Sequence, residues 1–108
     1  MIKYSDRLYL TENTRKNLAT IKLKLFTGAG MVGIHFILLS ANKEEVFDIV
    51  PAVMFKQRSF RKLPHIVIGI AESRRAAYKL VQEIIEEHLA ATGSYFELRK
   101  DMEERIVG

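Results

Sequence analysis

Three groups of residues have types and spacings that could carry chemistry, and the first is a short basic stretch. Four cations occur within seven residues, and the aromatic residues Phe55 and Phe60 are interleaved with them. Aromatic rings that stack on bases, beside cations that contact phosphates, commonly hold single-stranded nucleic acid. A solvated loop is the competing interpretation, because a run of charges is usually an exposed surface. The predicted basic site consists of Lys56, Arg58, Arg61, Lys62 and His65.

The second group is a predicted anion site at the start of a helix, formed by Ser73, Arg74 and Arg75. Free N–H groups, a hydroxyl and two guanidinium groups would converge there, just past the carboxyl end of an apolar strand. α/β proteins often hold phosphate or carboxylate at such a place. The alternative is a solvated face whose arginines pair with acids elsewhere or across an interface.

The third group is Gly28-Ala-Gly-Met-Val-Gly33, which matches the G-x-G-x-x-G dinucleotide fingerprint. That fingerprint works when it follows a buried strand and opens a helix, so that the pyrophosphate meets free helix N–H groups. Here Lys22 and Lys24 precede the glycines, and β-type residues follow them. We therefore expect a helix C-cap and a loop that enters a strand, while Asp48, at a suitable distance for a ribose contact, keeps the nucleotide interpretation open.

Other catalytic and metal signatures do not occur in the sequence. The absence of cysteine excludes disulfides and thiolate metal sites. His35, His65 and His88 fall on three different elements without metal-ligand spacing, and His65, beside Pro64, is expected to be the accessible one. Adjacent glutamates on a helix point apart, so none forms a general acid/base pair. We therefore predict no catalytic residue, no metal and no cofactor.

Two apolar runs, Met31–Ala41 and Ile66–Ala71, must position these groups. Neither alternates between apolar and polar residues, which predicts strands at about 31–40 and 65–71 that are buried on both faces. A chain of 108 residues has few elements with which to cover two faces. The runs therefore indicate packing against a second subunit or an added helix.

Periodicity and caps predict the other long elements. Residues 2–10 alternate as a strand with one polar face. Leu18, Ile21 and Leu25 recur at helical spacing before Gly28; residues 21–25 also alternate with period two, but we favour the helix. Residues 73–92 carry one apolar stripe that ends at a glycine, which is the clearest helix of the chain.

Shorter elements fill the gaps between these. We predict a short helix over 43–50 that Asn42 caps and Pro51 limits, a short strand over 52–57 and a loop over 58–64. Residues 95–98 are predicted as a last strand, and residues 99–107 as a charged tail that is helical in part.

Read in order, these elements predict a single α+β domain over residues 1–108, a ferredoxin-like β-α-β-(short α, short β)-β-α-β sandwich. Its two helices would cover one sheet face and leave an apolar face available for dimerisation. Strand 31–40 would fall at an edge, and an apolar edge is an aggregation liability unless something covers it. Either the short helix at 43–50 and the charged tail fold over this edge or a second subunit covers it, and we expect the second subunit.

Composition limits the function classes without choosing one. Apolar residues make up 48% of the chain and charged residues 28%, and the formal net charge of +4 permits an anionic partner without requiring one. The sequence has no signal-peptide pattern and no run of roughly 20 apolar residues that could span a membrane. We expect a cytoplasmic protein with no membrane partner.

Three hypotheses about function follow. The first is a non-catalytic binding or regulatory module that self-associates as a homodimer. The second is a protein that binds nucleic acid or a small anionic ligand such as phosphate or a nucleotide. The third is an enzyme whose site lies at a dimer cleft. The predicted superfold hosts unrelated functions, so the fold alone does not choose among them.

Overall fold

A five-stranded mixed sheet with the strand order β3-β2-β4-β1-β5 forms the centre of the molecule. Its strands are β1 (Ile2–Leu10), β2 (His35–Leu39), β3 (Phe47–Pro51), β4 (His65–Ala71) and β5 (Ile106–Val107). β1 and β4 are parallel, whereas the pairs β2/β4, β2/β3 and β1/β5 are antiparallel. The structure, a computed structural model, describes residues 2–94 and 97–107, the last two by their backbone only.

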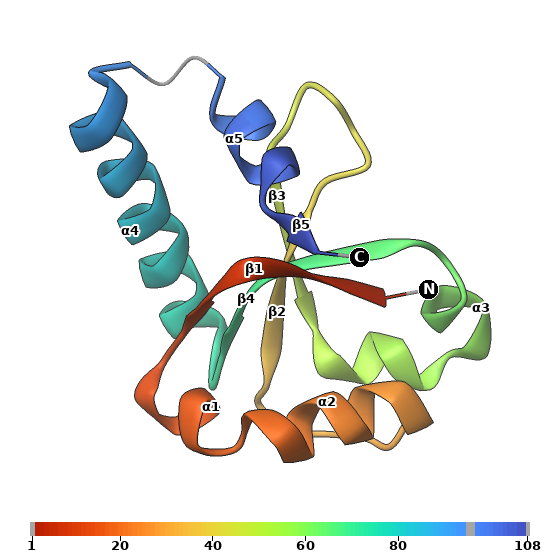
Figure 1. Cartoon of the computed structure of the whole chain (residues 1–108). Helices are drawn as coiled ribbons and strands as arrows, with labels where there is room; N and C mark the ends of the chain where they lie inside the picture. Colours follow the sequence, from red (N-terminus) through yellow and green to blue (C-terminus); the bar gives the residue numbers. More distant parts are fainter. Residues whose placement is uncertain (1, 95–96, 108) are drawn as a thin grey trace.

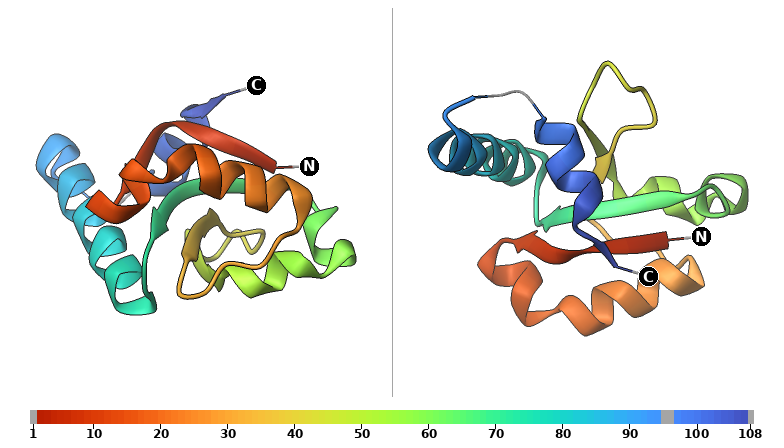
Figure 2. Two further views of the ribbon diagram at one scale, coloured as in Figure 1. Left: turned by 90° about the horizontal axis from the view of Figure 1, so that it is seen from below. Right: turned by 45° about the horizontal axis from the view of Figure 1, so that its top comes forward.

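Helical elements cover both faces of this sheet (Figure 1). They are α1 (Glu12–Lys16), α2 (Leu18–Thr27), the 3₁₀ helix η1 (Ala52–Lys56), α3 (Arg58–Arg61), α4 (Arg74–Thr92) and α5 (Leu98–Glu104). The core on one face joins α2 and η1 to the sheet through residues such as Ile21, Phe55 and Phe36. The core on the other face joins α4 and α5 through residues such as Ile84, Met102 and Ile68. α3 and α4 lie at opposite ends of the molecule (Figure 2).

The two apolar runs form strands buried on both faces, as the sequence predicts. Phe36 and Ile37 of β2 are adjacent, point to opposite faces and are both fully buried. Val67 and Ile68 of β4 behave in the same way. The first strand is shorter than predicted, because β2 begins at His35 and residues 31–34 belong to the preceding loop.

The predicted α+β class is confirmed, but the ferredoxin-like arrangement is not. A ferredoxin-like sandwich was expected to place both helices on one sheet face, whereas α2 and α4 lie on opposite faces. The physical reason lies in the strands: each central strand is apolar on both sides, so each side needs its own cover. The chain supplies both covers itself, and the apolar face predicted for dimerisation is occupied by its own helices.

The predicted apolar edge is also covered within the chain. β3 pairs with β2 over the whole of His35–Leu39, which makes β2 an internal strand. Residues 43–50 therefore do not form the predicted short helix. Asn42 accepts a hydrogen bond from the Glu44 N–H (3.0 Å) in a turn, and the β-type residues Phe47, Ile49 and Val50 then continue as a strand.

The next predictions were wrong in element type. Residues 52–56 form η1 where a short strand was expected, and residues 58–61 form α3 where a loop was expected. Phe55 explains the first difference, because the 3₁₀ turn places its ring in the core, 1% exposed and edge-on to Phe36 at a centroid distance of 5.3 Å. The packing of Phe55 therefore determined the conformation of residues 52–56, whose sequence pattern gave only a weak secondary-structure signal.

The longest helices follow the sequence closely. α2 ends at Gly28, whose φ of 78° gives the left-handed C-cap predicted for it. α4 begins after Ser73, whose hydroxyl accepts a hydrogen bond from the Ala76 N–H (3.0 Å), and it ends at Gly93 with a φ of 73°. Among the described residues, none of the helices has the length and apolar character that crossing a membrane requires.

At the C-terminal end, Tyr95 and Phe96 of the predicted last strand lie outside the described residues. Leu98, the last residue of that predicted strand, instead begins α5, and most of the predicted tail is helical. β5 then pairs with β1 at Tyr4 and Ser5. This path returns the chain to the sheet and packs α5 against α4.

Candidate functional site

The predicted basic site is divided by the structure. His65 is only 9% exposed, so the prediction that it is accessible was wrong; its Nε2 lies 2.6 Å from the Phe60 carbonyl oxygen. The Phe55 and Phe60 rings pack against the His65 ring, with centroid distances of 5.1 and 4.5 Å. The aromatic rings expected to stack on bases are therefore turned toward the core and toward one another. Lys56 and Arg58 are exposed, and Lys56 faces the glycine-containing loop 30–35.

Arg61 and Lys62 meet residues from a different part of the chain. Together with Lys22 of α2 they surround a cavity of about 540 Å³, which we call the basic apolar pocket. The cavity is lined by Ile2, Tyr4, Lys22, Phe26, Arg61 and Lys62. Its size is in the range of pockets that hold small organic ligands, and its walls combine an apolar body with a few polar groups, as such pockets do.

Contacts within the pocket hold several of these side chains in place. The Lys22 Nζ lies 4.5 Å from the centroid of the Tyr4 ring, in cation–π range. Arg61 donates a hydrogen bond from Nη1 to the Phe55 carbonyl oxygen (2.9 Å). A Cβ at Gly28 would overlap the Arg61 guanidinium, so the glycine that caps α2 also makes room for this arginine. Burial raises the pKa of the Tyr4 phenol above its usual value.

The helical elements on this side of the molecule carry cations and no acidic residue. Residues 13–43 and 49–71 contain no aspartate or glutamate, and together they supply every helical residue of α2, η1 and α3. Among the described residues, Lys22, Lys24 and Arg58 have no carboxylate within ion-pair distance. An anion that enters the basic apolar pocket therefore meets Lys22 and Arg61 on helices that contain no acidic residue.

Sequence reasoning missed Tyr4, Lys22 and Phe26 as members of this pocket. Its prediction followed neighbours along the chain, whereas these residues lie more than thirty positions before Arg61. One signal in the sequence could have drawn attention to them. The two long segments without acidic residues show where cations have no acidic neighbour along the chain, although they do not show that the segments meet in space.

The predicted anion site at Ser73, Arg74 and Arg75 lies at the other end of the molecule from α3. Ser73 caps α4, and its hydroxyl accepts from the Ala76 N–H. The Arg74 guanidinium carbon lies 5.9 Å from the Tyr78 ring centroid, and both arginines are exposed. The preceding residue, Glu72, accepts a hydrogen bond from the Thr11 hydroxyl (2.8 Å) and places a carboxylate near this helix start. The anion site stays a prediction.

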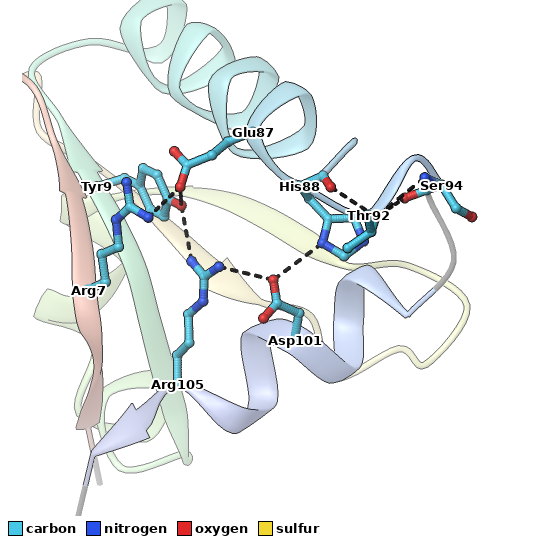
Figure 3. Close-up of polar contacts among 8 residues, drawn as sticks. All are labelled: Arg7, Tyr9, Glu87, His88, Thr92, Ser94, Asp101 and Arg105. Atoms are coloured by element: carbon cyan, nitrogen blue, oxygen red, sulfur yellow. Dashed lines mark hydrogen bonds and ion pairs between the residues drawn. The ribbon is translucent and has the colours of Figure 1, made fainter. Parts of the chain in front are cut away.

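A second polar region, which we call the α4/α5 network, joins β1, α4 and α5 (Figure 3). Glu87 accepts a hydrogen bond from the Tyr9 hydroxyl (3.2 Å) and pairs with Arg7. Arg105 donates to the Tyr9 hydroxyl from Nη1 (3.0 Å) and to Asp101 from Nη2 (3.0 Å). Asp101 also lies 3.3 Å from Nδ1 of the buried His88. Each charged group of the network thus has an opposite charge or a hydroxyl beside it.

The neighbouring carboxylates and hydroxyl also affect the pKa of Arg105. Burial opposes the charged guanidinium, but hydrogen bonding to Tyr9 and the nearby carboxylates of Asp101 and Glu87 outweigh it, so the pKa is raised. The neighbouring cavity of about 670 Å³ is lined by both signs of charge, including Lys100, Glu97 and Glu104. This network therefore fixes α5 against α4, and we do not assign a ligand to it.

The glycine motif and the histidines do not form further sites. Gly28–Gly33 joins the end of a helix to the start of a strand, which is the opposite of the order that a dinucleotide fingerprint needs. The His35 Nδ1 lies 2.7 Å from the Gly33 carbonyl oxygen, within the same loop. Within residues 2–94 and 97–107, no group of three or more histidine or acidic side chains is arranged to hold a metal ion.

Comparison with known proteins gives no match: no protein-family model, no curated protein and no solved structure is significantly similar to this chain. A functional conclusion has to rest on the geometry of the basic apolar pocket.

Proposed function

We propose that this chain is a binding module that holds a small anionic ligand with an apolar body in the basic apolar pocket. One observation carries this proposal: Lys22, Arg61 and Lys62 line an apolar cavity, and α2 and α3, which supply Lys22 and Arg61, contain no acidic residue. The cations would contact a carboxylate, sulfate or phosphate, while Ile2, Tyr4 and Phe26 would contact the apolar part. The proposal is one of binding without a chemical step.

Nucleic acid fits this side of the molecule less well than a small amphiphile. The two aromatic residues of the basic stretch stack against His65 inside the fold. Single-stranded nucleic acid is held largely by exposed aromatic platforms, each contributing about 1–3 kcal/mol per base. Without these two rings, Phe26 is left as one exposed ring beside the cations, so binding would rest mainly on salt-sensitive contacts with phosphates.

Isothermal calorimetry with dodecanoate, below its micellar concentration, tests the pocket. We expect Lys22→Gln to weaken dodecanoate binding about tenfold, because a hydrogen bond to a charged group contributes about 1.5–3 kcal/mol. Lys79→Gln is the matched control, since it removes an exposed cation from α4, away from the pocket. Unchanged affinity in Lys22→Gln, or an equal loss in Lys79→Gln, would contradict the proposal.

Self-association through the sheet is a second candidate function, and the position of β3 favours it. β3 is an edge strand, so its outer backbone groups have no partner within the described sheet. Pairing of two such edges across a two-fold axis would make a homodimer with one continuous sheet. Light scattering at micromolar concentration tests this, and a clean monomer near 12.4 kDa would exclude the dimer.

A further inference from the structure

The helix α2 exposes two large apolar side chains to solvent, beside Thr20 and Thr27, in addition to the apolar residues that it buries. Leu18, Ile21 and Leu25 pack into the core. On the outer side Leu23 is 63% exposed and Phe26 is 81% exposed, and Ala19, which lies between them in projection, is exposed too. A surface helix normally turns its large apolar residues to the core and its polar residues to solvent. Leu23 and Phe26 on the outer side of α2 are therefore large apolar residues that the fold leaves exposed.

Two cations of α2 flank this apolar strip, and α2 itself contains no acidic residue. At 100° per residue Lys22 and Lys24 fall on opposite flanks of the line through Leu23 and Phe26. Lys62 lies across the basic apolar pocket from α2, and the exposed Leu63 follows it. Exposed Phe and Leu side chains between basic residues are typical of helices that lie in a membrane interface.

We propose that the outer side of α2 docks on an anionic phospholipid bilayer. Phe26 and Leu23 would enter the boundary between head groups and acyl chains, while Lys22, Lys24 and Lys62 would contact the head groups. The surface belongs to a folded domain that lies on the bilayer, which differs from the spanning helix considered in the sequence. The mouth of the basic apolar pocket would then face the layer from which an amphiphile can enter.

The positive charge of α2 favours an anionic bilayer over a second copy of this chain as the partner of its outer side. A two-fold dimer through α2 would bring Lys22 and Lys24 of one copy toward the same residues of the other, and no acidic residue of α2 would compensate them. An anionic lipid surface supplies that compensation. Nucleic acid would also compensate the charge, and a base would stack on Phe26, but nucleic acid offers no apolar layer for Leu23.

Because the chain contains no tryptophan, a single reporter can be placed at the proposed contact. We expect the fluorescence of the Phe26→Trp variant to shift to the blue with vesicles of 70% phosphatidylcholine and 30% phosphatidylglycerol. Pure phosphatidylcholine vesicles should cause little shift. Tyr78→Trp, at a 55% exposed position on α4, is the matched control and should not respond. Equal responses of the Tyr78→Trp and Phe26→Trp variants would overturn the proposed orientation.

Sedimentation with the same vesicles measures the contribution of each side chain. We expect Phe26→Ser to lower the partition coefficient about tenfold, because the ring leaves water on docking. Lys24→Gln should lower it about fivefold, and 0.5 M salt should reduce binding further. Tyr78→Ser should leave it unchanged. Absence of binding to the anionic vesicles would overturn the proposal, as would a blue shift of the Phe26→Trp variant that grows with protein concentration alone.

A variant at Leu23 tests the docking surface independently of the proposed ligand site, because Leu23 does not line the basic apolar pocket. Leu23→Ser should weaken vesicle binding and leave dodecanoate binding unchanged. If dodecanoate binds but the vesicles do not, the docking surface is wrong and the pocket stands. Tight binding of an oligothymidylate without vesicle binding would assign the surface to nucleic acid and overturn the lipid proposal.

Discussion

The two helical sides of the sheet differ in how their charged residues are paired. On the α4/α5 side Asp101 lies between His88 and Arg105, and Glu87 pairs with Arg7, so charges of both signs are joined across elements. On the α2/α3 side the helical residues carry cations and no acidic residue. Compensated charges fix two helices against each other, whereas charges that the fold leaves without carboxylates are available to an external anion.

The same contrast holds for apolar residues. α4 follows the usual pattern, with Ala77, Leu80 and Ile84 buried and charged residues on its outer side. α2 instead exposes Leu23 and Phe26. One side of the molecule is therefore complete by itself, while the other carries both an uncovered apolar strip and uncompensated charge. Their coincidence on one side is what makes a partner the simplest explanation.

Core truncation on each side should have the largest effects on stability. We expect Phe55→Ala to lower the free energy of unfolding by about 3–5 kcal/mol and Met102→Ala by about 2–5 kcal/mol, because both side chains are 1% exposed. Urea unfolding followed by circular dichroism measures both. The variants should differ in binding, since the Phe55 ring packs on Phe60 of α3 at a centroid distance of 5.0 Å, and α3 carries Arg61. Equal dodecanoate affinities in the two variants would argue against that separation.

Two helix C-caps give a more selective comparison. Gly28 and Gly93 both have positive φ, at 78° and 73°, so alanine at either position is strained by about 1–2 kcal/mol. At Gly28 the added Cβ also displaces Arg61, whereas at Gly93 it meets open space. We expect Gly28→Ala to be the more destabilising in urea unfolding by about 1 kcal/mol. Equal losses would show that Arg61 moves aside without cost.

Removal of a charge should matter on one side only. Asp101→Asn takes the carboxylate from between His88 and Arg105, and we expect a loss of about 1–2 kcal/mol. Arg58→Gln removes an exposed cation on α3, and its effect should stay within about 0.5 kcal/mol. Thermal and urea unfolding of both variants provide the measurement. A larger loss in Arg58→Gln than in Asp101→Asn would reverse the comparison.

The smallest expected effect is a pH dependence at Tyr4. Because burial raises the pKa of Tyr4 above 10.0, the folded chain holds this phenol proton more tightly than the unfolded chain. The stabilisation is complete below pH 10 and is lost as the pH rises through the folded pKa. Tyr4→Phe should remove the tyrosinate absorbance step with the raised midpoint and flatten the alkaline stability profile. A removed step centred at or below pH 10 would contradict the burial of this phenol.

Most of the fold could be predicted where a pattern was long and had clear ends. β4 was predicted within one residue, and α4 was predicted between Ser73 and Gly93, since apolar runs, stripes and caps report directly on backbone geometry. Residues 43–61 were assigned wrongly because their patterns are short. There Phe47–Pro51 became a strand by pairing with β2, and Phe55 drew 52–56 into a 3₁₀ turn by packing on Phe36.

The candidate site was predicted only in part, because half of it comes from another segment. Arg61 and Lys62 belong to the predicted basic site and do line the pocket, whereas His65 turned inward to pack on Phe60. Nothing local to Lys22 or Phe26 indicates a pocket. They join it because α2 crosses the sheet beside the start of β1, where Ile2 and Tyr4 lie.

By itself the sequence determined the α+β class, the doubly buried strands, the capped helices and the two segments without acidic residues, because periodicity, caps and charge are properties of neighbours along the chain. Only the tertiary structure decided which faces the helices cover, that β3 rather than a second subunit pairs with β2, and that Lys22 meets Arg61. These features depend on contacts between residues far apart in sequence, which local pattern does not encode. The exposed side of α2 needs both kinds of information: the sequence gives its residue types, and the tertiary structure determines that they are exposed.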